Sequence, residues 1–116
     1  MDEKIEKALS VANYMATLSN QRRIIFEEFN QKTLYYINGA TFKITPNLIS
    51  HAKTTVDLGY TSDVAFLDSN NFPIIINDVQ KFLEDIQEIY FSALNEYAVK
   101  YTDIKSKRKI DDIINL

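Results

Sequence analysis

The 116-residue sequence contains no cysteine and no tryptophan, and glycine and proline occur only twice each. Without cysteine the chain cannot form disulfides, thiolate zinc sites or cysteine-held iron–sulfur clusters. The sequence also lacks the run of about 18 apolar residues that a membrane-spanning helix needs. Its first residues mix charges and have no apolar signal-peptide core. We therefore expect a cytoplasmic protein that does not enter a membrane.

Recognisable catalytic motifs are missing as well. The chain has no phosphate-binding loop, dinucleotide-binding motif, nucleophile elbow or zinc motif. His51 is the single histidine, and no Ser-His-Asp or Cys-His arrangement accompanies it. Asp68 begins a calcium-loop pattern, but Pro73 stands at its glycine position and Val79 at its glutamate position. We therefore predict a protein that is not an enzyme and that binds no cofactor or metal.

The sequence Asn38-Gly39 is typical of a two-residue type I′ hairpin turn, because both positions accept a positive φ. If these residues form the turn, the flanking residues pair across it, and six of them share one apolar face. The expected pairs are Ile37 with Ala40, Tyr35 with Phe42 and Thr33 with Ile44.

Helical patterns surround this hairpin. Residues 2–30 contain no glycine or proline, and their apolar side chains recur at helical spacing. Thr45-Pro46 begins a helix that should span 46–58, before Gly59. The positions that recur at spacings of three, four or seven and indicate an amphipathic first helix are Ile5, Leu9, Ala12, Ala16, Arg23 and Phe26.

A second hairpin and a long helix complete the pattern. Strands over 64–67 and 72–76 flank the polar turn 68–71, and a helix capped by Asn77 or Asp78 follows to about residue 105. The sequence therefore predicts one α+β domain over residues 1–105 with the order α-ββ-α-ββ-α. A small antiparallel sheet should pack on the helices, and residues 106–116 should form a tail.

The last helix carries an apolar stripe that is wider than one small domain can cover. We therefore expect a homo-oligomer or a protein partner, with aromatic side chains at the contact, because such residues anchor interfaces. The candidate interface residues on this helix are Tyr90, Tyr97 and Tyr101.

The tail combines a basic run with a short amphipathic pattern. Ile110, Ile113 and Ile114 are spaced as one face of a helix, which could enter the groove of a partner or fold back on its own domain. The basic run could end a helix favourably or contact an anion such as nucleic acid. It consists of Lys105, Lys107, Arg108 and Lys109.

Three stretches, "VANYMATLSNQRR", "YYINGATFKITPNLISHAKTTVDLG" and "VAFLDSNNFPIII", carry a resemblance to a known group. With them the chain resembles small uncharacterised proteins of T-even-like marine cyanophages, over roughly residues 5–105. The resemblance brings no catalytic residues with it. It implies expression in the cytoplasm of an infected host cell and a role in virion assembly or host takeover.

These features favour a non-enzymatic interaction or assembly protein that acts through long amphipathic helices and oligomerisation. The resemblance points to a phage origin. The alternative is a nucleic-acid-binding accessory protein that uses the basic run of the tail. The net charge of −3 is unfavourable for that alternative, because affinity for nucleic acid depends on neutralising phosphates.

Overall fold

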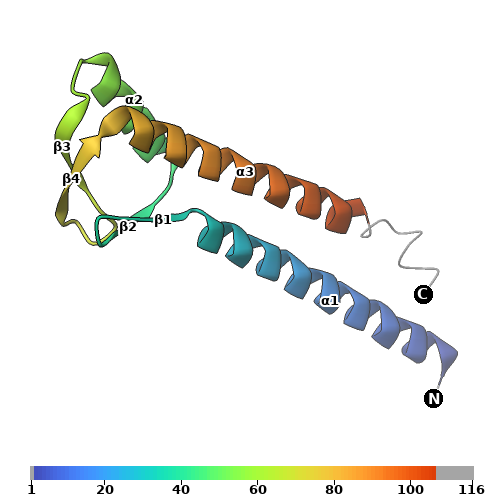
Figure 1. The fold of residues 1–116 in the computed structure, drawn as a ribbon. Coiled ribbons are helices and arrows are strands. Elements are labelled where there is room, and N and C mark those ends of the chain that lie inside the picture. The colour runs from blue at the N-terminus through green and yellow to red at the C-terminus, as the bar shows by residue number, and fades with distance from the viewer. Residues whose placement is uncertain (1, 107–116) are drawn as a thin grey trace. The chain divides into compact units, whose positions relative to one another are not determined.

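The computed structural model describes residues 2–106. The described chain contains three helices and two hairpins in the order that the sequence predicts (Figure 1), which confirms the α+β class. The elements are α1 (Glu3–Lys32), β1 (Leu34–Ile37), β2 (Ala40–Lys43), α2 (Pro46–Asp57), β3 (Ser62–Leu67), β4 (Pro73–Asp78) and α3 (Val79–Ser106).

The chain divides into two compact units. The first, here the helical unit, comprises Met1–Phe29 and Asn95–Leu116, and the second, the sheet unit, comprises Asn30–Leu94. Within residues 2–106, no helix is both long enough and apolar enough to cross a membrane.

The first hairpin of the sheet unit has the predicted register. Asn38 and Gly39 adopt φ values of 52° and 74°, as a type I′ turn requires. Ile37 pairs with Ala40 and Tyr35 with Phe42, and the Ile44 amide extends the ladder by donating to the Thr33 carbonyl at 2.8 Å. The turn chemistry therefore sets which side chains of this hairpin face the core.

The carboxylate of Asp68 holds the turn of the second hairpin. Its Oδ1 accepts hydrogen bonds from the amides of Asn70 and Phe72, both at 2.9 Å. These bonds keep Phe72 in the turn, so β4 begins at Pro73 and not at the predicted Phe72. The turn then contacts the first hairpin, because the Ser69 amide donates to the Thr41 carbonyl at 2.9 Å.

The two hairpins remain separate two-stranded sheets, and such pairs are marginal unless they pack on something else. Side chains tie them together: Asn38 Nδ2 donates to the Ile75 carbonyl at 3.0 Å, and the Lys43 amide donates to Ser69 Oγ at 2.8 Å. The sheets and two helices then share one buried cluster. Its members are Ala40, Phe42, Ile44, Ala52, Phe66, Ile76, Val79, Phe82, Leu83 and Ile86.

Both helices of this cluster are capped as the sequence indicates. Thr45 Oγ1 accepts from the Leu48 amide at 3.1 Å at the start of α2, and Gly59 follows the helix with a φ of 89°, where a side chain would be strained. Asp78 Oδ1 accepts from the Lys81 amide at 3.0 Å at the start of α3. These caps hold the buried faces of α2 and α3 against the hairpins.

Candidate interaction surface

In the helical unit, aromatic rings link α1 to the last part of α3. The ring of Tyr97 lies 5.2 Å from that of Phe29 and 5.9 Å from that of Phe26. One turn further along α3, the guanidinium of Arg22 lies over the ring of Tyr101 at 5.5 Å. The partners run in opposite directions along the two helices, so α1 and this part of α3 are antiparallel.

A pair of carboxylates holds Lys100 beside these rings. Its Nζ lies 2.8 Å from Glu28 Oε2 on α1 and 3.0 Å from Glu96 Oε1 on α3. The hydrogen bonds to Glu28 and Glu96 raise the pKa of the Lys100 ammonium above its ordinary value. The charged lysine therefore bridges the two helices.

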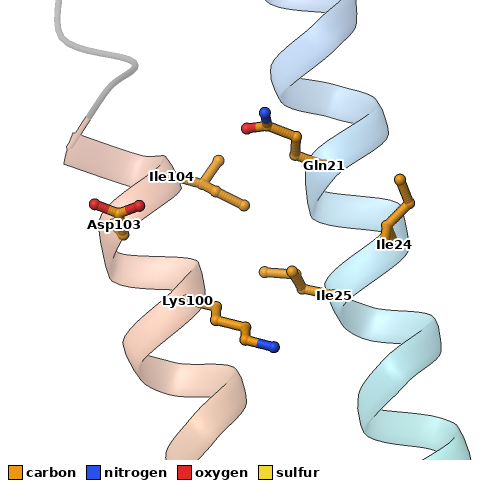
Figure 2. A pocket seen from close by; sticks show the side chains of 6 residues that line it. All are labelled: Gln21, Ile24, Ile25, Lys100, Asp103 and Ile104. Atoms are coloured by element: carbon orange, nitrogen blue, oxygen red, sulfur yellow. The ribbon is translucent and has the colours of Figure 1, made fainter.

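An open pocket of about 270 Å³ lies between the two helices, beyond Lys100. Ile25 and Ile104 point into it from opposite sides, and Gln21 extends into the same space (Figure 2). The remaining lining residues are Ile24, Lys100 and Asp103. Three isoleucines make much of the lining apolar, and Lys100 and Asp103 are its charged residues.

Helix α1 carries two rows of side chains, each with alternating steps of three and four residues. The inner row is buried or half-buried, and Leu18 within it keeps only 2% of its surface exposed. It consists of Val11, Met15, Leu18, Arg22, Ile25 and Phe29.

The outer row lies about 100° around the same helix. It contains the six periodic positions that indicate this helix in the sequence, with Ser19 added, and its members are Ile5, Leu9, Ala12, Ala16, Ser19, Arg23 and Phe26. All of them are exposed, including half of the surface of Ile5 and Leu9 (51% each) and 48% of Phe26. The helix forms as predicted, and the row that the chain itself covers is the adjacent one.

The predicted interface tyrosines lie in two places. Tyr97 and Tyr101 belong to the helical unit, where their rings lie 6.2 Å apart and contact α1. Tyr90 belongs to the sheet unit and packs against its core. All three side chains therefore have contacts within the chain, and Tyr101 is the one that the structure leaves exposed.

Most of the predicted tail residues lie outside the described residues. These are Lys107, Arg108, Lys109, Ile110, Ile113 and Ile114. Lys105 belongs to the last turn of α3 and is exposed.

A second exposed apolar surface lies on the outer face of the β3–β4 hairpin. Cross-strand pairing places Ala65 opposite Ile75 and Leu67 opposite Pro73, and all four residues are exposed. The alternate residues of the same strands, such as Phe66 and Ile76, are in the core. The stretch "VAFL" opposite "PIII" signals a hairpin that is apolar on both faces, and the prediction of the interface missed it.

The polar groups of the sheet unit show no catalytic arrangement. The Tyr35 hydroxyl donates to Asp85 Oδ2 at 3.0 Å, and burial, with the hydrogen bond and charge of Asp85, raises the pKa of Tyr35. His51 is exposed, with its ring edge-on to Phe66 at 5.1 Å. Among residues 2–106, no three histidine, cysteine or acidic side chains gather where a metal could bind.

Comparisons with protein-family models, with curated proteins and with solved structures found no match to this chain. The resemblance to cyanophage proteins therefore stays a prediction.

Proposed function

We propose that the protein is a non-enzymatic interaction or assembly protein, and that the outer row of α1 is its contact surface. The observation that supports this function most directly is the exposure of Ile5, Leu9 and Phe26 along one helical face. Six of the seven side chains in the outer row are apolar or small, Arg23 being the exception, and a row of this kind is a recurrent way for one helix to dock on another.

The free energy available from this surface is modest. Complete burial of a leucine, isoleucine or phenylalanine side chain contributes about 1.5–3 kcal/mol. Since about half of each surface is already covered at Ile5, Leu9 and Phe26, their burial by a partner contributes roughly 3 kcal/mol in total. The contact is therefore of the kind that forms and dissociates readily, unless the partner adds contacts of its own.

Two further observations support an interaction function. The outer face of the β3–β4 hairpin offers another group of exposed apolar side chains, which includes Leu67 and Ile75, and exposed apolar patches mark contact sites. The resemblance to cyanophage proteins suggests the setting, which is virion assembly or host takeover in the cytoplasm of an infected cell.

The test compares the full chain with two variants of neighbouring residues on α1. Leu9→Glu places a charge in the outer row, whereas Ser10→Glu places the same charge at the next position, which is exposed and outside the row. Molar mass is measured by size-exclusion chromatography with light scattering. A protein partner is sought by affinity capture from cells in which the chain is expressed, with helix content checked by circular dichroism.

We expect the wild-type chain and Ser10→Glu to exceed the monomer mass or to retain a partner, and Leu9→Glu to lose that property while keeping its helix content. If all three chains are monomers that retain no partner, the proposed function is wrong. If Leu9→Glu associates as strongly as the wild-type chain, the contact lies outside the outer row.

A further inference from the structure

We propose that the outer row of α1 binds the same row of a second copy of the chain, with the two helices antiparallel. This inference rests on the proposed function and names the partner of its surface. The steps of four and three residues from Ile5 to Phe26 are those of a heptad seam, the pattern by which two helices wind around each other.

An antiparallel pairing matches large side chains with small or flexible ones. When Ala12 lies opposite Ala16 of the second copy, Leu9 lies opposite Ser19 and Ile5 lies opposite Arg23. The two alanines at the centre let the helix backbones approach closely, and the leucine fills the space that the serine leaves. The register also repeats itself in both copies, as a two-fold symmetric contact requires.

The charges at the ends of the row select this orientation. Opposite Ile5, Arg23 of the second copy lies beside Glu6 and one helical turn from Asp2. In a parallel pair the two Arg23 side chains face each other and repel. Among residues 2–106, the salt bridge of Arg23 is to Glu27, at 2.9 Å and largely exposed, and such a pair is exchanged at little cost.

The complete absence of cysteine allows a direct test of the orientation by disulfide trapping. Full-length Ala12→Cys and Ala16→Cys chains are mixed in equal amounts and oxidised mildly, and the linked peptides are counted by mass spectrometry. The matched control mixes Ser10→Cys with Thr17→Cys, since both residues are exposed on α1 and lie outside the row.

Random pairing of the two chains would give twice as many 12–16 links as either 12–12 or 16–16 links. The antiparallel contact predicts that 12–16 links exceed each of the other two kinds by well over this factor of two. It also predicts that the control mixture forms far fewer links. Predominant 12–12 and 16–16 links would instead show a parallel pair. Links at equal levels in both mixtures would show random collision, and either result overturns the inference.

A charge exchange tests the contact without cysteine. By sedimentation equilibrium of the full chain, Arg23→Glu should weaken dimerisation by about tenfold, because the glutamate then faces Glu6. Adding Glu6→Arg to Arg23→Glu should restore most of the affinity. No recovery overturns the register. A wild-type chain that is monomeric at every concentration overturns the inference of a second copy, whereas a partner retained in the capture assay would still uphold the proposed function.

Discussion

Phe82 lies at the centre of the aromatic packing in the sheet unit. It is 1% exposed, and its ring lies 5.3 Å from those of Phe42 and Phe66 and 5.9 Å from that of Tyr35. Phe82→Ala removes the group that joins both hairpins to α3, at a cost of about 3–5 kcal/mol. With a urea m-value of about 1.5 kcal/mol/M, the unfolding midpoint should fall by roughly 2–3 M.

The matched control is Phe91→Ala, the same substitution on the same helix. Phe91 is 51% exposed. Within the described residues, the one aromatic ring that its own ring contacts is that of Tyr90, at 5.5 Å. Its truncation should cost less than about 1 kcal/mol. Urea unfolding followed by circular dichroism measures both variants. Equal midpoints for Phe82→Ala and Phe91→Ala would refute the placement of Phe82 at the centre of this core.

Three further outcomes are expected. Thr45→Ala should lower the free energy of unfolding by about 1 kcal/mol in a thermal or urea melt, because the Leu48 amide loses its acceptor; an unchanged melt would exclude the cap. Burial and Asp85 raise the pKa of Tyr35 above 10.0, so its neutral form stabilises the fold below pH 10, and that contribution is lost as the pH rises further. Urea midpoints between pH 8 and 11 should therefore fall more for the wild-type chain than for Tyr35→Phe, and parallel curves would contradict this linkage. Finally, replacing the basic residues of 105–109 with glutamine should leave the affinity for duplex DNA unchanged. If the wild-type chain binds DNA with an affinity that falls steeply with salt, and the replacement abolishes this binding, the nucleic-acid alternative is favoured.

The first hairpin was predictable residue by residue because its information is local. Asn38-Gly39 accepts the φ values of one turn type, and that turn allows one register. Tyr35 and Ile37 were thereby assigned to the face that contacts the core, and Ile44 to the end of the ladder. The caps of α2 and α3 were predictable for the same reason, since an oxygen next to a helix start has one common role.

The ends of the second hairpin were not predictable from hydrophobic pattern. Strands β3 and β4 each extend to polar residues, and Ser62 pairs with Asp78 there, although neither residue adds to an apolar alternation. Their strand conformation comes from backbone pairing and from the junction with α3, where the Val79 amide donates to the Thr61 carbonyl at 3.0 Å. Contacts between residues far apart in sequence decide such ends.

Helix α1 shows most clearly what sequence alone leaves undecided. Periodicity establishes that a row of apolar side chains exists, but two rows one residue apart both satisfy a seven-residue repeat. The row with Leu18 is covered by the chain itself, whereas the row with Leu9 is not. That choice depends on where Tyr97 and Tyr101 of α3 make their contacts, which no local pattern in α1 encodes.

The exposure of this periodic row is also informative about function. A sequence specifies its fold when pattern and burial agree, and the places where they disagree tend to be functional. Ile5 and Leu9 are each 51% exposed, yet they recur in phase with Ala12 and Ala16, which a helix facing only water would not require. A second helix packed on this row restores the agreement between pattern and burial. The outer row of α1 is therefore the first surface on which the proposed contact should be tested.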